Sequence, residues 1–281
     1  MYKTILLGAR GMLGQDVAAA ISHLSPVCVD LPEVDITNFT QITDFICSNK
    51  PDVVINCAAY TAVDACEQNV DLVFRVNGEG VKNLAIACEK AGSELLHIST
   101  DYVFDGEKGA PYIEFDATNP QNVYGMSKLY GERALVNHMT RFYILRTQWL
   151  YGAGGNNFVK TMLKLAGEGK PVRVVDDQFG SPTFSKDLAG LIVQMIMTGQ
   201  YGIYHATNGG GISWYQFAKD IFDAAEIDVD LAPVTSEQFV RPAKRPKYSV
   251  LDNMALRLAG FQPMRPYREA LEEYIRITAN Q

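Results

Sequence analysis

Cysteine and histidine are scarce in this chain of 281 residues, and neither has the spacing of a common metal site. The five cysteines include no CxxC pair, and the four histidines show no HxxxH spacing, so familiar zinc motifs are absent. We therefore assign no metal ligand. We expect the cysteines to be small buried hydrophobes in a reducing cytosol: Cys28, Cys47, Cys57, Cys66 and Cys88.

An excess of positive charge and long apolar runs are missing too. Lys and Arg number 25 against 32 Asp and Glu, which gives a net charge of −7 and argues against a nucleic-acid partner. No window reaches about 18 apolar residues, and the apolar run at the start is too short for a signal peptide. We expect a cytoplasmic protein that makes no membrane contact. With 47% hydrophobic and 20% charged residues, it should be globular and need no disulfide.

The first half alternates two kinds of segment. Short apolar runs lie at 4–7, 27–30, 53–56, 95–99 and 142–146, and helix-like stretches lie at 12–24, 37–49, 70–91 and 124–137. Continuous apolar runs are typical of strands buried on both faces. Their alternation with helices predicts right-handed βαβ units. We expect an α/β fold with a Rossmann doubly wound parallel sheet.

The second half is less regular. Helices are predicted at 157–166, 186–197 and 213–224, and strands at 172–175 and 203–206. We expect residues 1–150 to form the dinucleotide-binding domain, completed by a segment near 180–206. Residues 151–281 should form mainly a smaller, discontinuous α/β substrate lobe. The stretch 233–247 predicts a structured loop, and it carries the one basic cluster of this acidic chain: Arg241, Lys244, Arg245 and Lys247.

A glycine pattern links the first predicted strand to the first predicted helix. Gly8, Gly11 and Gly14 form GxxGxxG, with Arg10, Met12 and Leu13 between them. Glycines at this junction allow a tight turn and a close approach of the backbone to a pyrophosphate, and the helix N-terminus favours the phosphate charge. The pattern predicts a dinucleotide site, although glycines can also serve turn geometry alone.

The signals for the kind of dinucleotide conflict. Asp30 ends the second predicted strand, where a carboxylate can bond the adenosine ribose and favour NAD. Arg10 favours NADP, because a guanidinium can pair with a 2′-phosphate. Asp35 and Ile36 either contact the adenine or merely precede a helix. Small residues after the third strand, Ala58 and Ala59 before Tyr60, would let the cofactor lie against the backbone.

The strongest chemical signal is Tyr124-Gly-Met-Ser-Lys128 on a predicted helix. Residues four apart share one helix face, and a Lys ammonium beside a phenol lowers its pKa. A tyrosine tuned in this way can protonate a carbonyl oxygen as hydride reaches the carbon. The run Ser99-Thr100-Asp101, at the end of the preceding strand, adds a hydroxyl at the same sheet edge.

These motifs together resemble the extended short-chain dehydrogenase/reductases. Within that class the chain resembles the dTDP-4-dehydrorhamnose reductases, over most of its length and more loosely after about Ile227. The resemblance rests on the runs Ala58-Ala-Tyr-Thr-Ala-Val-Asp64, Ser99–Phe104, Asn122-Val-Tyr-Gly125, Arg146-Thr-Gln-Trp149 and Asp177-Gln-Phe-Gly-Ser-Pro-Thr183.

The resemblance implies an oxidoreductase of dTDP-rhamnose biosynthesis that reduces the 4-keto group of dTDP-4-dehydro-L-rhamnose. Tyr124 would donate the proton, Lys128 would hold the nicotinamide ribose, and Thr100 would bind the substrate carbonyl. It also implies cofactor contacts at Ala58–Thr61, with Thr61 completing that run. Sugar contacts are implied at Asp101, Tyr102 and Trp149, although Trp149 fits a core position equally well. Asn157 and Arg245 are weaker candidates for the substrate diphosphate.

Several alternatives stay open on the sequence. The cofactor is NADPH or NADH, and Mg²⁺ enters through the resemblance only, because no local ligand motif supports it. The charges at Glu269, Glu272 and Glu273 fit a solvated C-terminal helix better than a metal site. The chain could also be a nucleotide-sugar epimerase or dehydratase, or a non-catalytic regulatory subunit. We expect a monomer or a homodimer.

Overall fold

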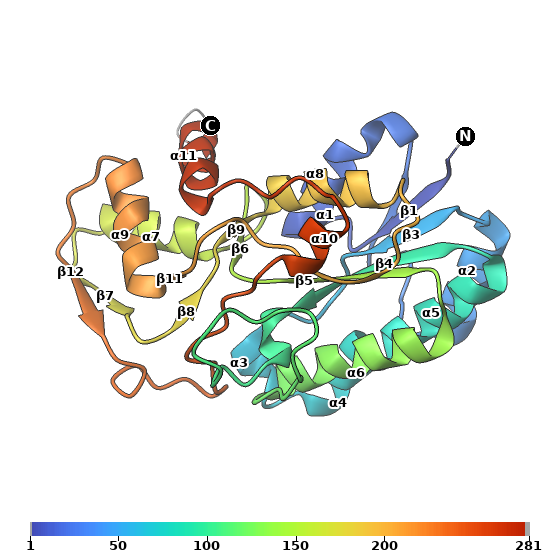
Figure 1. Ribbon diagram of the computed structural model, residues 1–281, viewed down its shortest axis with the longest axis horizontal. Coiled ribbons are helices and arrows are strands. Elements are labelled where there is room, and N and C mark those ends of the chain that lie inside the picture. The colour runs from blue at the N-terminus through green and yellow to red at the C-terminus, as the bar shows by residue number, and fades with distance from the viewer. Residues whose placement is uncertain (1, 279–281) are drawn as a thin grey trace.

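A six-stranded parallel sheet forms the centre of the larger half of the molecule (Figure 1). The computed structural model describes residues 2–278. Within them, the strands of this sheet lie in the spatial order β10 (Gly202–His205), β5 (Phe142–Thr147), β4 (Glu94–Thr100), β3 (Val53–Asn56), β1 (Thr4–Leu7) and β2 (Val27–Val29).

The strand order reverses direction between β1 and β3. From β1 the chain moves outward to β2, and it then returns to β3 on the other side of β1. Such a reversal opens a crevice beyond the carboxyl ends of the two central strands, which is where ligands bind in open α/β folds. The turn after β1 is the glycine turn, and the turn after β3 begins at Cys57.

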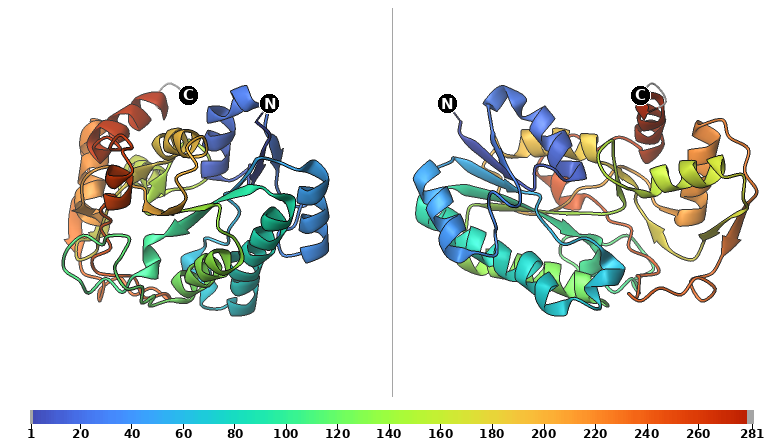
Figure 2. Two further views of the ribbon diagram at one scale, coloured as in Figure 1. Left: turned by 45° about the vertical axis from the view of Figure 1, so that its right-hand side comes forward. Right: turned by 180° about the vertical axis from the view of Figure 1, so that it is seen from behind.

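Helices cover both faces of the sheet, so its strands are buried on both sides (Figure 2). Neighbouring side chains on β1 face opposite ways: Leu6 packs in one core cluster, and Ile5 and Leu7 pack in the other. One face carries α1 (Met12–Ala20), α8 (Ser185–Met195) and α10 (Met254–Leu258), and the other carries α2 (Phe39–Asn49), α5 (Gly80–Ala91) and α6 (Val123–His138). The predicted doubly wound α/β fold is confirmed.

A smaller lobe lies beside the sheet, at the left of Figure 1. Its core is rich in aromatic side chains, with Tyr151, Phe217 and Tyr274 almost fully buried. It is built from α7 (Phe158–Gly167), α9 (Trp214–Ala224), α11 (Tyr267–Thr278) and the parallel pair β7 (Val172–Val175) and β12 (Leu231–Val234). The boundary at residue 150 stays a prediction, and β10 and α8 from the second half pack with the sheet.

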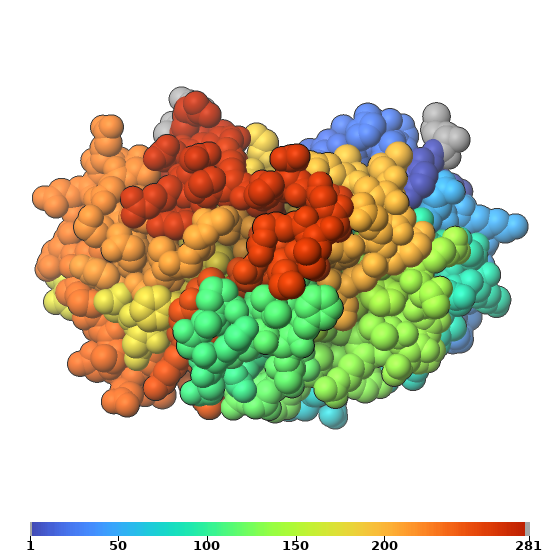
Figure 3. Space-filling view, viewed as in Figure 1, coloured from blue at the N-terminus to red at the C-terminus, as the bar shows by residue number. Residues whose placement is uncertain are grey.

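Short elements connect these parts. A long loop after β4 lies against the C-terminal segment, green against red in Figure 3, where Tyr112 forms a bridge with Leu251. The short elements are η1 (Ser22–Leu24), α3 (Val63–Cys66), α4 (Val70–Phe74), η2 (Arg75–Glu79), η3 (Asp101–Val103), β6 (Leu150–Tyr151), β8 (Phe179–Gly180), β9 (Thr183–Phe184) and β11 (Ile212–Ser213).

The predicted long helix at 70–91 is interrupted. It consists of α4, the π-helical turn η2 and α5; its predicted start at Val70 and its predicted end at Ala91 are confirmed, and Gly92 follows with a φ of 75°. The predicted loop at 233–247 also differs from the structure, because its first residue, Pro233, belongs to strand β12 and pairs with Val174 of β7. A proline fits there because β12 has a neighbour on one side only within its two-stranded sheet.

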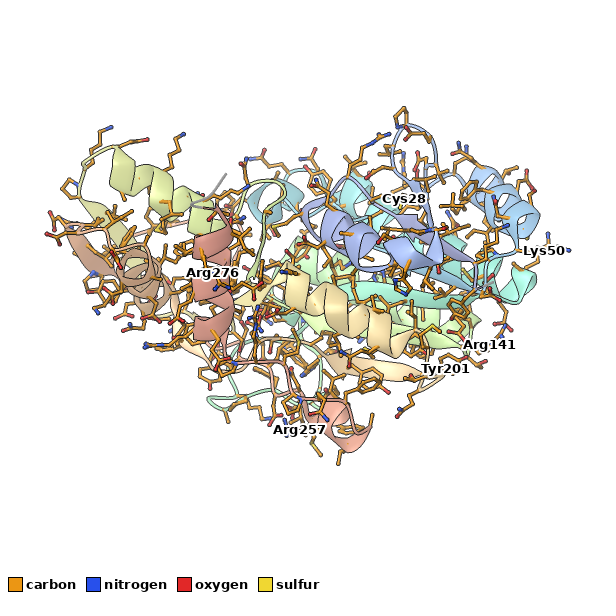
Figure 4. All side chains as sticks on the ribbon, turned by 90° about the horizontal axis from the view of Figure 1, so that it is seen from above. Cys28, Lys50, Arg141, Tyr201, Arg257 and Arg276 are labelled. Atoms are coloured by element: carbon orange, nitrogen blue, oxygen red, sulfur yellow. The ribbon has the colours of Figure 1, made fainter. Side chains whose placement is uncertain are left out.

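The expectation that the cysteines are buried is wrong for three of the five. Cys66 and Cys88 are buried, Cys47 and Cys57 are partly exposed, and Cys28 is exposed on edge strand β2 (Figure 4). An edge strand is covered less completely, and β2 sends Val27 and Val29 toward the core instead. No helix among residues 2–278 is long and apolar enough to cross a bilayer.

A buried ion pair joins α6 to the centre of the sheet. Arg146 on β5 donates to both carboxylate oxygens of Glu132, at 3.0 and 2.7 Å, and Ser99 on β4 donates to the same carboxylate. Both charged side chains are at most 4% exposed. Removal of one partner from such a pair leaves an uncompensated charge in the core.

We predict that Glu132→Ala destabilises the protein by about 3–5 kcal/mol, because Arg146 then stays buried without its counter-ion. The urea midpoint of unfolding measures the loss. Lys219→Ala, which removes a solvent-exposed partner of Asp223, should leave that midpoint almost unchanged. Equal midpoints for the two variants would refute the structural role given to Glu132.

Candidate active site

The glycine turn brings β1 into direct contact with the turn after β3. Gly8 has a φ of 72°, and a Cβ on it would lie 2.5 Å from the backbone nitrogen of Ala58. A Cβ on Gly14 would lie 2.1 Å from the Gly8 carbonyl oxygen. Gly11 occupies the N-cap of α1 with no side-chain cap, so the first N–H groups of the helix are free to bind an anion.

A cleft of about 300 Å³ opens beside this turn. Gly8 and Gly11 line one wall, and Ala58 and Ala59 line another. The remaining wall includes the predicted residues Asp30, Asp35 and Ile36. Ile36 also packs into the core, where a Cβ on Gly80 would approach it to 2.8 Å, so the two interpretations of the 35–36 pair are compatible.

Asp30 and Arg10, which were predicted to favour different dinucleotides, lie together and both make hydrogen bonds to Leu31. Both carboxylate oxygens of Asp30 accept backbone N–H groups, from Arg10 at 2.9 Å and from Leu31 at 2.8 Å. The Arg10 guanidinium, which is 62% exposed, donates to the Leu31 carbonyl oxygen at 2.6 Å and pairs with Glu33. Asp30 therefore shapes the turn, and Glu33 neutralises the cation at the mouth of the cleft.

Asn77 holds the other wall of the cleft, and the sequence analysis missed it. It lies on the π-helical segment η2, and its side chain bonds the backbone that follows β3. It accepts from the Tyr60 N–H at 2.8 Å and donates to the Tyr60 carbonyl oxygen at 3.0 Å and to Ser127 Oγ at 3.0 Å. One buried amide thus connects the predicted Ala58–Thr61 cofactor wall to helix α6. A π-helical turn leaves no clear signal in sequence.

Tyr124 and Thr100 meet at the carboxyl end of β4. Asn122 caps α6 by accepting from the Gly125 N–H at 2.8 Å, and so fixes the first helical turn, which contains Tyr124. Burial raises the pKa of Tyr124, and a hydrogen bond with Thr100 opposes that rise. The predicted lowering of its pKa by Lys128 is therefore wrong for this structure. A phenol that keeps its proton suits a proton donor.

Lys128 lies one turn further along α6 and is 2% exposed. Its Nζ donates to the Ile98 carbonyl oxygen at 2.6 Å and lies 3.3 Å from His97 Nε2. Burial lowers the pKa of Lys128 to about 8, and the negative charge of Glu132 partly offsets this lowering. Its head group faces β4, which explains why it does not act on the phenol of Tyr124.

The residues expected at the sugar line a very narrow cavity. Asp101, Tyr102 and Trp149 line a space of about 10 Å³ beside Trp214 and Arg245. That volume holds about one water molecule, so these side chains must move to admit a sugar. The Trp149 ring stacks on Trp214 with 3.4 Å between ring centres, so it is a packed aromatic that also lines this cavity, and its contact with a sugar stays a prediction. Burial raises the pKa of Asp101 to about 6.

The basic loop forms a wider cavity next to this one. It has about 350 Å³, is lined by Arg241, Lys244 and Lys247 among others, and shares Gln178 and Arg245 with the narrow cavity. Arg245 donates to both oxygens of Asp64, at 2.9 and 3.0 Å. These hydrogen bonds hold the pKa of Asp64 below its usual value. Asp64 anchors the loop, a role that its place in the run Ala58–Asp64 did not reveal.

Asn157 is not brought to these cavities. Its side chain caps α7 by accepting from the Lys160 N–H at 3.0 Å, and it donates to the Gly152 carbonyl oxygen at 2.8 Å. It also contacts Met12 Sδ at 3.8 Å. Asn157 therefore holds the 152–155 loop against the start of α1, and we do not carry it forward as a diphosphate ligand.

The acidic residues of α11 do not fit a magnesium site. The Glu273 carboxylate already binds Lys186 at 2.8 Å and Arg265 at 2.7 Å, and Glu269 and Glu272 are exposed. Among residues 2–278, no group of three or more His, Cys, Asp or Glu is placed to hold a metal ion. We derive no step through magnesium.

A crevice at the switch point of a parallel sheet, with a tyrosine and a lysine four residues apart on one helix, is typical of the extended short-chain dehydrogenase/reductases. The chain is of this class. Residues 2–280 match the model of the RmlD substrate-binding domain family.

Similarity to known proteins identifies the family within this class. The chain is 43% identical to dTDP-4-dehydrorhamnose reductase of Streptomyces griseus, over 96% of this chain and 91% of the relative. It is 37% identical to dTDP-4-keto-6-deoxy-D-glucose reductase of Streptomyces niveus, over 96% and 95%. A crystal structure of dTDP-4-dehydrorhamnose reductase from Bacillus anthracis in complex with NADP aligns with a TM-score of 0.95 at 41% identity, over 97% and 98%. The chain belongs to the dTDP-4-dehydrorhamnose reductase family.

We predict that Gly8→Ala weakens dinucleotide binding at least about tenfold, because the new Cβ would collide with the Ala58 backbone at a φ that L-residues avoid. Titration of protein fluorescence with the reduced dinucleotide measures the dissociation constant. Gly167→Ala, on α7 with nothing within 4 Å of its Cβ, is the matched control and should bind as the wild type does. An unchanged constant for Gly8→Ala would exclude the turn as the binding site.

Proposed function

We propose that the protein reduces the 4-keto group of dTDP-4-dehydro-L-rhamnose to give dTDP-L-rhamnose, with NADPH or NADH as the hydride source. The observation that carries this proposal is the hydrogen-bonded pair of the buried Thr100 and the half-buried Tyr124. It lies where the end of β4 meets the first turn of α6, next in sequence to Asp101 of the narrow cavity, in a chain of the reductase family. The protein would work in the cytoplasm, as a monomer or a homodimer.

The chain's own residues would orient the carbonyl and supply the proton. A bound reduced nicotinamide supplies the hydride to C4. The Thr100 and Tyr124 hydroxyls would both hydrogen-bond the 4-keto oxygen, and Tyr124 would transfer its proton to that oxygen as negative charge develops there. Thr100 Oγ1 now donates to Asp101 Oδ1 at 3.0 Å, so it must rotate its hydroxyl hydrogen toward the substrate.

The basic loop would bind the diphosphate of the substrate. Arg241, Lys244 and Lys247 line the wider cavity, which adjoins the narrow one at Arg245. Guanidinium and ammonium groups are the usual partners of phosphate oxygens. This placement would put the nucleotide in the wider cavity and the sugar beside Tyr102 and Trp149, at the reacting end.

An assay of reduced dinucleotide consumption tests the function. The substrates are dTDP-4-dehydro-L-rhamnose and dTDP-4-keto-6-deoxy-D-glucose, each offered with NADPH and with NADH. Stoichiometric loss of nicotinamide absorbance with the L-sugar supports the proposal, and preference for the D-sugar redirects it within the reductases. Isomerised sugar with a retained dinucleotide would indicate an epimerase. No turnover with either sugar would leave the regulatory-subunit hypothesis.

We predict that Tyr124→Phe lowers kcat by about 10²–10⁴, the usual effect of losing a positioned general acid. Steady-state kinetics at saturating substrate measures the effect. Tyr130→Phe, on the same helix but exposed and bonded to Glu79, should retain wild-type kcat. If Tyr124→Phe keeps kcat within a few-fold, another group donates the proton.

Cofactor choice depends, in our proposal, on the Arg10–Glu33 pair at the mouth of the cleft. A 2′-phosphate placed beside Arg10 would share the guanidinium with the Glu33 carboxylate, and two anions there repel one another. We predict that Glu33→Gln lowers KM for NADPH about two- to fivefold and leaves KM for NADH unchanged. Arg10→Ala should raise KM for NADPH about tenfold.

The control for both variants is NADH in the same assay, because it lacks the 2′-phosphate. Parallel changes in KM for the two cofactors would contradict a 2′-phosphate site at Arg10. An unchanged KM for NADPH in Arg10→Ala would remove the argument for that site altogether.

A further inference from the structure

A chain of buried polar side chains lies behind the catalytic helix. Asn56 ends β3, His97 lies on the neighbouring strand β4, and Lys128 lies on α6; none is more than 2% exposed. Asn56 Nδ2 lies 3.0 Å from His97 Nδ1, and His97 Nε2 lies 3.3 Å from Lys128 Nζ. Buried polar groups inside a sheet core are costly unless each donor faces an acceptor.

The backbone fixes the direction of this chain. Asn56 Oδ1 accepts the Ala58 N–H at 3.1 Å, so the amide group of Asn56 must present Nδ2, a donor, to His97. His97 Nδ1 is then an acceptor and carries no proton. Full burial lowers the pKa of His97 well below its usual value, so the ring is neutral and its single proton lies on Nε2.

A donor therefore points at Lys128. The His97 Nε2–H can be accepted by the lone pair of a neutral amine, whereas an ammonium group has only donors to offer. The Ile98 carbonyl oxygen accepts from Nζ in either state. The geometry thus favours the amine over the ammonium form, independently of burial.

Other titratable groups near Lys128 also bear on whether it is an ammonium or an amine. Glu132 on α6 favours the ammonium, but its carboxylate is already shared by Arg146 on β5 and Ser99 on β4. Cys57, after β3, has a thiol whose pKa burial raises, so it stays uncharged. Tyr124, one turn back on α6, is neutral for the same reason. His97 is the group whose hydrogen bond to Nζ distinguishes the two forms.

We propose that Asn56 and His97 are positioning residues that hold the Nε2–H of His97 against Lys128 and thereby stabilise its neutral amine. The proposal deepens the proposed function and rests on it for its kinetic consequence. In that function the ammonium form of Lys128 would hold the nicotinamide ribose. Loss of its proton would weaken that hold, so His97 would set the pH above which turnover falls.

Two measurements on the resting protein test this without any turnover. In protein labelled with ¹⁵N-histidine, His97 should show a protonated Nε2 and an unprotonated Nδ1; the signals that vanish in His97→Gln identify the residue. A protonated Nδ1 would overturn the proposal. Because no substrate is present, this outcome is independent of whether the reductase activity is found.

The second measurement follows Lys128 by NMR of ε-¹³C-lysine, with the signal assigned by its loss in Lys128→Met. His97→Leu removes the donor, so the midpoint of the Lys128 titration should rise by about one pH unit, tenfold in the protonation equilibrium. His97→Gln keeps a neutral amide that can accept from Asn56 and donate to Lys128, and should titrate as the wild type does.

The alkaline limb of kcat against pH should follow the same order, moving to higher pH in His97→Leu and staying in place in His97→Gln. A merely structural histidine would give two variants with equal titrations, which would refute the proposal. Thermal unfolding checks that His97→Leu is folded; if it is not, the tautomer measured in the wild type decides.

Discussion

The close approach of two backbone turns is the constraint on which the rest of the molecule depends. Gly8 and Ala58 lie so near one another that a single Cβ would separate them. The contact exists because the chain reverses direction between β1 and β3, and it sets the depth of the dinucleotide crevice. Gly8 on one wall of the cleft and Ala58 on another are placed by that spacing.

Buried amide side chains connect these two turns to helix α6, which carries Tyr124 and Lys128. Asn77 bonds both backbone groups of Tyr60 and the Ser127 hydroxyl, and Asn56 connects Ala58 to His97. Arg146 on the neighbouring strand β5 and Glu132 on α6 add an ion pair between the helix and the sheet. Helix α6 is therefore positioned by directed polar bonds within an apolar core, and such bonds specify one arrangement where apolar packing alone would tolerate several.

The sequence allowed the fold and the chemistry to be predicted where a local pattern has a local cause. Glycines at a strand end, apolar runs buried on both faces, and Tyr124 four residues before Lys128 all act over short distances along the chain. What was missed depends on contacts between distant segments. Asp64 and Arg245, which bond to one another, are 181 residues apart, and the exposure of Cys28 follows from the place of β2 at the sheet edge. The environment of Lys128 required His97 from another strand.

One peptide group takes part in two of these arrangements. The Ala58 peptide lies against Gly8, and its N–H is also the donor that orients the Asn56 amide. A dinucleotide that displaces this peptide would alter the tautomer preference of His97 and hence the proton affinity of Lys128. Linkage then works in both directions, so that the proton on Lys128 affects how tightly the dinucleotide is held. Occupancy of the cleft and protonation of Lys128 would then be thermodynamically coupled.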